Sequence, residues 1–229
     1  MYAQVVLFDG FDPLDVIAPF EVLVAGGMAT GGELTVELVS AEGPREVVGG
    51  AGGLSLRATA ALDPDRAGIV LVPGASGPLE DPDDTGVDTI PVLLARTLET
   101  ELPGLLGRAL RDPAVLVATV CGGSLVLGMA GLIEGRHAVT HHLAMDALAA
   151  TGAHVVDARV VDDGDLVSAG GVTSGLDLGL YLLERELGPR VARSVEQLFA
   201  YERRGTVWRG EGLEPRTTFD AVATPAGAA

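Results

Sequence analysis

Cys121 is the residue best suited to covalent chemistry, and it is the one cysteine in the 229-residue sequence. It follows the apolar run 115–120, which predicts a buried parallel strand, and it precedes Gly122, Gly123 and a helical pattern. A sharp strand-to-helix turn with small neighbours is the geometry of a nucleophile elbow. The start of a helix also favours a thiolate over a thiol. This position favours a nucleophile over the alternative, a buried cysteine that packs as a small apolar residue.

Asp15 is the second candidate. It lies in Asp12-Pro13-Leu14-Asp15, just after a strand predicted over 2–8. These residues begin a helix that we predict from Pro13 to about Val24, with Gly26-Gly27 ending it. Asp12 fits the N-cap of this helix better. Asp15 lies on the same turn as the apolar Leu14 and Ile17-Ala18, so we expect it to be partly buried. Glu21, six residues further on, is its rival. A carboxyl beside a thiolate should have a raised pKa, which suits a general acid or base.

Two further segments carry polar groups beyond predicted strands. Thr140-His141-His142 follows a short strand, but adjacent histidines point in opposite directions on an extended chain, so we predict no metal site. Gly74 and Ala75 follow the strand predicted over 68–72, and their N–H groups could face an oxyanion. Gly170 to Gly175 is interpreted as a turn that caps a helix, because the chain lacks the lysine and the fingerprint of a phosphate loop.

Composition excludes several kinds of chemistry. All 15 basic residues are arginines, which excludes lysine Schiff bases, pyridoxal-phosphate anchoring and the Walker A lysine. A single cysteine excludes an internal disulfide and a multi-cysteine metal centre. The net charge of −17 disfavours nucleic acid and anionic membranes as partners. No apolar run reaches the ~20 residues of a membrane span, and the N-terminus lacks the basic region of a signal peptide, so we expect a cytoplasmic protein.

The elements around these residues alternate between strands and helices. Such alternation predicts one α/β domain over residues 1–216, a parallel sheet between helices, followed by a disordered tail over 217–229. Ligands of such sheets bind beyond the carboxyl ends of the strands. The other expected elements are a strand over 34–39, an exposed acidic loop over 80–88, helices over 90–111 and 142–151, a hairpin over 154–167, and helices over 175–187 and 189–203.

Four stretches of the sequence, in the same order as in the family, resemble the DJ-1/PfpI superfamily. Within that superfamily the resemblance is to the isonitrile hydratases. They are FDGFDPLDVIAPFEVL (8–23), VLVPG (70–74), VATVCGGSLVLGMAGLIEGRHAVTHH (117–142) and SAGGVTSGLDLGLYLLERELG (168–188). The resemblance implies a flavodoxin-like fold, a cofactor-independent site and a homodimer. It places the nucleophile on Cys121, the carboxylate on Asp15 and a nearby histidine on His141. It also implies oxyanion donors on the Gly74–Ala75 loop and at Gly122.

The sequence departs from this family pattern at three places. Gly122 stands where isonitrile hydratases usually have threonine and PfpI-type proteases histidine, which disfavours a protease. Pro-Gly-Ala replaces the usual Pro-Gly-Gly loop, a change that keeps a backbone donor. Thr140-His141-His142 replaces the usual Thr-His-Trp, so His142 gives the predicted pocket a more polar wall.

Three functions remain open from the sequence. The first is a hydratase, a lyase that converts an isonitrile and water, through a thioimidate on Cys121, to an N-substituted formamide. The second is hydration of methylglyoxal-type aldehydes through a Cys121 hemithioacetal, with protons moved by His141 and His142. The third is a ligand or redox sensor without turnover. The first two take a small electrophilic substrate, and the third acts through a partner protein or through oxidation of Cys121.

Overall fold

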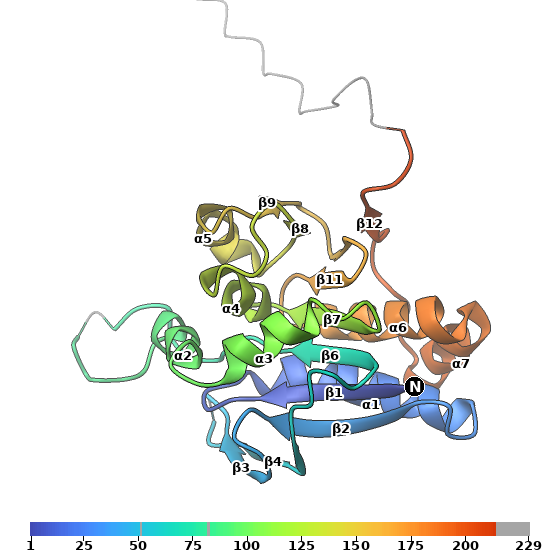
Figure 1. Cartoon of the computed structure of the whole chain (residues 1–229), viewed down its shortest axis with the longest axis horizontal. Coiled ribbons are helices and arrows are strands. Elements are labelled where there is room, and N and C mark those ends of the chain that lie inside the picture. The colour runs from blue at the N-terminus through green and yellow to red at the C-terminus, as the bar shows by residue number, and fades with distance from the viewer. Residues whose placement is uncertain (51, 82, 214–229) are drawn as a thin grey trace, which may run out of the picture.

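The computed structural model describes residues 1–50, 52–81 and 83–213. Its centre is a sheet in the order β12-β10-β11-β7-β6-β1-β2-β5 (Figure 1). The bounds of its strands, in chain order, are β1 Tyr2–Leu7, β2 Thr35–Ser40, β5 Ala60–Ala61, β6 Gly68–Val72, β7 Val115–Val120, β10 Val160–Asp162, β11 Leu166–Ala169 and β12 Trp208–Arg209. The strands from β11 to β5 are parallel, whereas β10 runs antiparallel to β11.

Helices cover both faces of this sheet. The helix bounds are α1 Pro13–Ala29, α2 Ile90–Thr97, α3 Leu102–Ala109, α4 Gly123–Met129, α5 Met145–Ala150, α6 Ser174–Leu187 and α7 Pro189–Phe199. Helices α1, α6 and α7 pack together on one face, while α4 contacts α2, α3 and α5 on the other. The central strands β6 and β7 are almost wholly buried and rich in valine, as expected for strands covered on both sides. The predicted α/β parallel-sheet sandwich is confirmed.

The predicted end of the first helix was wrong. Helix α1 continues through Gly26 and Gly27 to Ala29. A Cβ on Gly26 would lie 2.2 Å from a methyl group of Leu183 in α6, and one on Gly27 would lie 2.2 Å from the Leu34 carbonyl oxygen. These glycines therefore permit close packing of the helix, instead of ending it.

The helix predicted over 90–111 is two helices, α2 and α3. Their boundary lies at residues 98–101, where the Thr100 hydroxyl accepts a hydrogen bond from the Leu102 N–H at 3.1 Å. Pro103 follows at the second position of α3, a position that tolerates proline because its N–H needs no partner. Local capping therefore restarts the helix in a new direction.

Two small sheets lie outside the central one. The hairpin predicted over 154–167 is formed only by β10 and β11, because β9 (His154–Val155) pairs with β8 (His137–Ala138). Strands β3 (Arg45–Val48) and β4 (Ser55–Ala58) form a second hairpin, which the sequence pattern did not predict. The helix predicted over 142–151 begins as a 3₁₀ turn, His142–Ala144, before α5.

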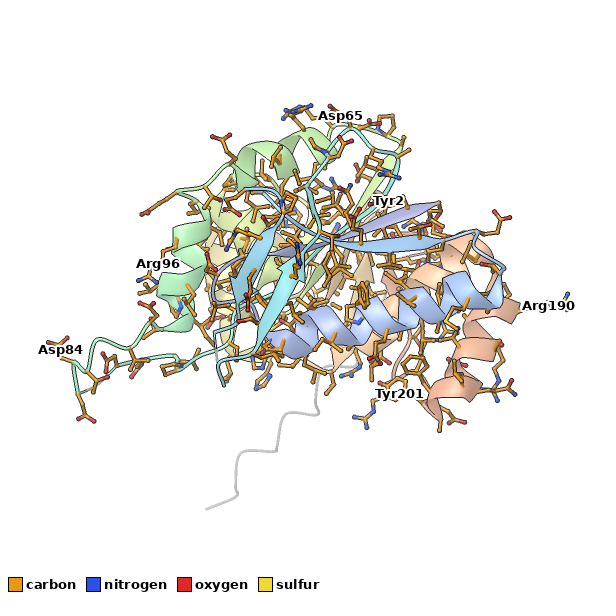
Figure 2. The ribbon with its side chains drawn as sticks, turned by 90° about the horizontal axis from the view of Figure 1, so that it is seen from below. Tyr2, Asp65, Asp84, Arg96, Arg190 and Tyr201 are labelled. Carbon is orange, nitrogen blue, oxygen red and sulfur yellow. The ribbon has the colours of Figure 1, made fainter. Side chains whose placement is uncertain are left out.

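The described residues of the acidic segment, 80–81 and 83–88, project from the body as a mostly exposed loop, with Asp84 at its tip (Figure 2). The predicted tail over 217–229 lies outside the described residues. In the part of the chain that the structure describes, no helix combines the length and the apolar character needed to cross a membrane.

Candidate active site

Four neighbouring strands converge on the candidate site. The chain leaves the carboxyl end of β1 for α1, that of β6 for Pro73-Gly74, that of β7 for Cys121 and that of β11 for Gly170. The β1 and β6 loops are joined by the Asp12 N–H, which donates to the Gly74 carbonyl at 2.8 Å. Adjacent parallel strands thus bring together residues that are far apart in the sequence.

Cys121 occupies a strained turn between β7 and α4. Its φ is +54°, in the left-handed region that costs a residue with a Cβ about 1–2 kcal/mol. The Cys121 N–H donates to the carbonyls of Ala169 and Gly170, each at 2.9 Å, and its own carbonyl accepts from the Thr140 hydroxyl at 2.7 Å. These bonds hold the backbone in the shape of a nucleophile elbow.

Buried hydroxyl groups below the elbow fix its position. The hydroxyls of Thr119 and Ser124 are 2.6 Å apart, and the Ser124 hydroxyl donates to the Val139 carbonyl at 2.7 Å. The Val139 N–H in turn donates to the Ser168 hydroxyl at 2.9 Å. Sequence reasoning missed this network and the role of Thr140 as an anchor, because the partners lie on four different segments. The one local indication of that role was the position of Thr140 beside His141.

Asp15 lies in the first turn of α1 and is completely buried. Its Oδ2 accepts the Gly74 N–H at 2.9 Å, and its Oδ1 has no hydrogen-bond partner among the described residues. Burial raises the pKa of Asp15 well above its usual value, with a smaller contribution from the negative charge of Asp12. Its rival Glu21 is exposed on the same helix. Asp12 caps the helix, as predicted, by accepting the Leu14 N–H at 2.9 Å.

The Cys121 thiol has a different electrostatic environment from the one expected. Burial raises the pKa of Cys121, and the nearby Asp15 carboxylate raises it further. The Gly122 N–H acts in the opposite direction but does not outweigh them. Helix α4 has only seven residues, so its dipole contributes little. Burial therefore opposes the thiolate that this turn was expected to favour, and it opposes the ionised form of Asp15 as well.

The backbone donors near Cys121 differ in their availability. The Gly74 N–H is engaged by Asp15, so Gly74 positions the carboxyl. A Cβ on Gly74 would lie 2.8 Å from the Asp15 Oδ2 and 2.6 Å from the Gly122 nitrogen, which explains why this position carries glycine. The Ala75 N–H donates no hydrogen bond within the described residues. Ala75 thus retains an unused donor, whereas the Gly122 N–H interacts with the Cys121 sulfur and lowers the pKa of the thiol.

Helix α2 supplies an apolar wall at the residue after the cysteine. A Cβ on Gly122 would lie 3.2 Å from Leu94 Cδ1 and 3.4 Å from Gly74 Cα. Leu94 is 2% exposed. Its side chain therefore occupies the space that a side chain at position 122 would take. Sequence reasoning identified the missing side chain at Gly122 but not the residue that replaces it.

The two histidines have separate surroundings. The His141 ring lies against Gly171, where a Cβ would come within 3.5 Å of the ring Cδ2, and its Nδ1 accepts the Leu143 N–H at 3.3 Å. Partial burial lowers the pKa of His141, and the neighbouring His142 lowers it further. His142 is exposed, with its ring centroid 4.3 Å from that of His141. His141 is thus held by its own turn, and His142 faces outward.

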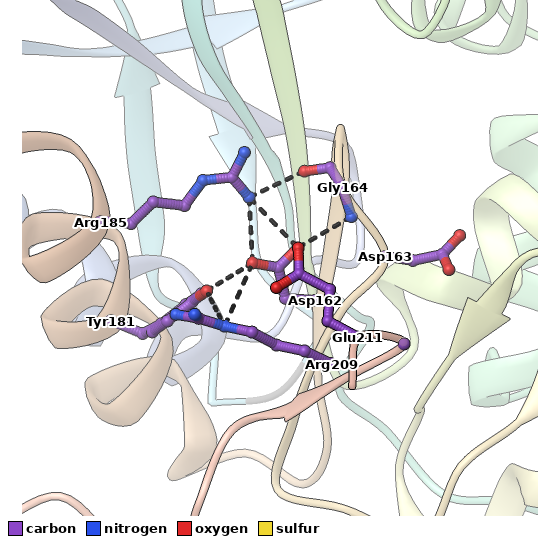
Figure 3. Close-up of a pocket in the computed structure, with 8 residues that line it drawn as sticks. Asp162, Asp163, Gly164, Tyr181, Arg185, Arg209 and Glu211 are labelled. Atoms are coloured by element: carbon purple, nitrogen blue, oxygen red, sulfur yellow. Dashed lines mark hydrogen bonds and ion pairs between the residues drawn. The ribbon is translucent and has the colours of Figure 1, made fainter. Parts of the chain in front are cut away.

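A polar cavity of about 430 Å³ lies at the other end of the sheet (Figure 3). In it Asp162, on antiparallel β10, accepts from the Tyr181 hydroxyl and from Arg185 at 3.2 Å. Arg209 of β12 donates to the Tyr181 hydroxyl at 3.1 Å. This cluster ties β12 to α6 and lies far from the carboxyl ends of the parallel strands. Among the described residues no group of three or more His, Cys, Asp and Glu side chains is placed to hold a metal ion.

Comparison with known proteins identifies the family. The family model described as DJ-1/PfpI matches residues 97–185. The chain is 33% identical to an isonitrile hydratase of Pseudomonas putida over 198 residues, which are 85% of this chain and 76% of that protein. The chain belongs to the DJ-1/PfpI family. The chain is also 33% identical to the HTH-type transcriptional regulator CdhR of Pseudomonas aeruginosa over 98 residues, which are 42% of this chain and 29% of that protein.

Solved structures agree with the DJ-1/PfpI assignment. A THiJ/PfpI family protein from Pseudomonas syringae is 26% identical, with a TM-score of 0.68, and the match covers 89% of this chain and 76% of that chain. Drosophila melanogaster DJ-1beta, at 20% identity and a TM-score of 0.71, covers 88% of this chain and 98% of its own. The second likeness shows the fold alone.

Proposed function

We propose that this DJ-1/PfpI protein is a cofactor-independent hydratase that converts an isonitrile and water to an N-substituted formamide. The observation that carries the proposal is the Asp15–Cys121 pair. A completely buried carboxyl, whose pKa is raised by burial, lies beside the one thiol of the chain and has one oxygen unpartnered within the described residues. The similarity to an isonitrile hydratase over 85% of the chain supports this choice of substrate.

The proposed first step moves two protons and forms two bonds to the isonitrile carbon, one to hydrogen and one to sulfur. Asp15 donates its proton to the terminal carbon of the isonitrile, which makes that carbon electrophilic. The Cys121 sulfur attacks the same carbon, and the thiol proton passes to the Asp15 carboxylate. The product is a thioimidate in which the carbon carries the new hydrogen. A neutral thiol and a neutral carboxyl are the starting states that this step requires.

The second step releases the product. Water adds across the C=N bond, with its hydroxyl on the carbon and a proton on the nitrogen. The C–S bond then breaks, the hydroxyl proton returns to the sulfur through Asp15, and an N-substituted formamide leaves. The N–H groups of Ala75 and Gly122 orient the intermediate. The apolar Leu94 side chain, in contact with the Gly122 position, favours a substrate with an apolar group.

The other functions find less support in this geometry. The interpretation as an aldehyde hydratase was favoured by a pocket in which both histidines move protons, whereas His142 is exposed and the His141 Nδ1 is engaged with its own turn. A peroxide sensor needs an accessible thiolate, whereas Cys121 is 8% exposed and its pKa is raised by burial. The hydratase is therefore the function that the site supports best.

The test is hydration of cyclohexyl isocyanide, followed by chromatography of N-cyclohexylformamide. We expect turnover by the native protein and a loss of about 100-fold or more in kcat for Cys121→Ser and for Asp15→Asn, the size of a lost general acid. Glu21→Gln, an exposed acid on the same helix, is the matched control and should retain native activity. Undiminished turnover in both site variants, or no turnover by the native protein, would contradict the proposal.

A further inference from the structure

Ser174 carries a buried hydroxyl that the site described above does not use. It is the first residue of the 14-residue helix α6 and is 1% exposed. Its Oγ has no hydrogen-bond partner among the described residues. Buried hydroxyl groups are nearly always paired, because an unpaired one destabilises the fold. Its presence at a helix start, where the macrodipole is positive, indicates a role in binding.

A cavity of about 240 Å³ lies in front of this hydroxyl. Its volume corresponds to roughly eight water molecules in the liquid, enough for a small polar ligand. The polar and glycine residues that line it are Thr140, His142, Asp157, Arg159, Gly170, Gly171 and Ser174. Asp157 is exposed, so its carboxylate lies at the rim. The cavity shares Thr140 and Gly170 with the backbone anchors of Cys121.

The groups around Ser174 are mostly donors. Helix α6 has no side-chain cap, because the Thr173 hydroxyl instead accepts from Arg159 Nη2 at 2.9 Å. Arg159 Nε donates to Asp177, while its Nη1 has no hydrogen bond to the described residues. The N–H of Gly171 likewise donates to none of them. An N–H, a guanidinium nitrogen and a hydroxyl without recorded partners therefore belong to residues that line one small cavity.

We propose that this cavity binds a small oxyanion, the carboxylate or phosphate group of a small molecule. Ser174 Oγ and the Gly171 N–H donate to its oxygens, and Arg159, whose Nε is in an ion pair with Asp177, donates from Nη1. Sequence analysis interpreted this glycine-rich turn as a simple helix cap. With the cavity beside it, this turn can bind an anion without a lysine, because backbone and hydroxyl donors at the start of a helix suffice for an anion.

The test measures binding alone. Isothermal titration with inorganic phosphate and, separately, with acetate, at constant ionic strength, should show saturable binding to the native protein with a Kd of about 1 mM or lower for at least one of them. The anion that binds more tightly, phosphate or acetate, shows whether the cavity prefers a phosphate or a carboxylate group. Ser174→Ala should weaken that binding at least tenfold without lowering the melting temperature of the ligand-free protein, because the lost hydroxyl had no partner.

Ser40→Ala is the matched control. The Ser40 hydroxyl is also buried but donates to the Gly43 carbonyl at 2.7 Å, so this variant should lose stability and keep native anion affinity. Cys121→Ser should also bind normally, which separates this proposal from the hydratase. Absence of binding of both anions to the native protein, or equal affinity in Ser174→Ala, would overturn the proposal.

Discussion

At the scale of single residues, the site depends on two buried titratable side chains held by tight backbone contacts. Asp15 is buried and accepts one N–H from Gly74, which is too little to offset the loss of solvent around its charge. Cys121 sits in a left-handed turn that a Cβ makes costly. Such unfavourable features are typical of sites where function is maintained at the expense of stability.

The contact between Gly122 and Leu94 gives a prediction at this scale. Gly122→Thr should lose about 1–3 kcal/mol of the free energy of unfolding, because its Cβ would lie 3.2 Å from Leu94 Cδ1. In combination with Leu94→Ala, the loss should be smaller than the sum of the two single losses by about 0.5–3 kcal/mol, because the smaller residue makes room. Urea unfolding of the four proteins measures this coupling.

The control for this cycle is Gly104→Thr in helix α3. A Cβ on Gly104 meets nothing within 4 Å, so this variant should be close to native in stability. Strictly additive losses for Gly122→Thr and Leu94→Ala would show that the two positions do not compete for the same space.

At the scale of elements, local patterns predicted most strands and helices but not their long-range contacts. The apolar run 115–120 and the turn at Cys121 were predicted correctly, because they are encoded within a few residues. The end of α1 was not predicted correctly, because Gly26 is there to allow close packing against Leu183 on a distant helix. Likewise, nothing near Gly122 in the sequence indicates that α2 places Leu94 against it. Close packing between separate segments is the part that one sequence does not reveal.

The cluster that joins β12 to α6 gives a prediction about pH. Tyr181→Phe should lose about 1.5–3 kcal/mol of the free energy of unfolding near neutral pH, because the phenol donates to the charged Asp162. Burial raises the pKa of Tyr181 to about 12, from an unfolded value of about 10. The folded state therefore keeps a proton that the unfolded state loses, so this stabilisation is complete below about pH 10 and disappears as the pH approaches 12.

Denaturant unfolding of native and Tyr181→Phe protein across this pH range measures the effect. The difference between the two should shrink as the pH rises through that window. A difference that stays constant or grows at high pH would mean that Tyr181 does not hold its proton in the folded protein.

At the scale of the whole molecule, charge selects the kind of partner. The net charge of −17 repels large anions at long range and leaves neutral small molecules unaffected, which suits an isonitrile substrate. The donor-rich cavity at the start of α6 is a local exception in this acidic protein. We propose a cytoplasmic protein for which nucleic acid and anionic membranes are poor partners.

The resemblance to this family also leads us to propose a homodimer. Sedimentation equilibrium at several protein concentrations should give twice the mass of the 229-residue chain. The mass of a single chain at every concentration would contradict this expectation.

The central claim is that a neutral Asp15 carboxyl acts as the proton donor beside the Cys121 thiol. Infrared spectroscopy tests this claim most directly. The native protein near neutral pH should show the C=O stretching band of a protonated, buried carboxyl. This band should be absent from Asp15→Asn and should disappear from the native protein only when the pH rises past the raised pKa of Asp15. A native spectrum without this band near neutral pH, identical in that region to the spectrum of Asp15→Asn, would show that Asp15 is ionised and would contradict the account.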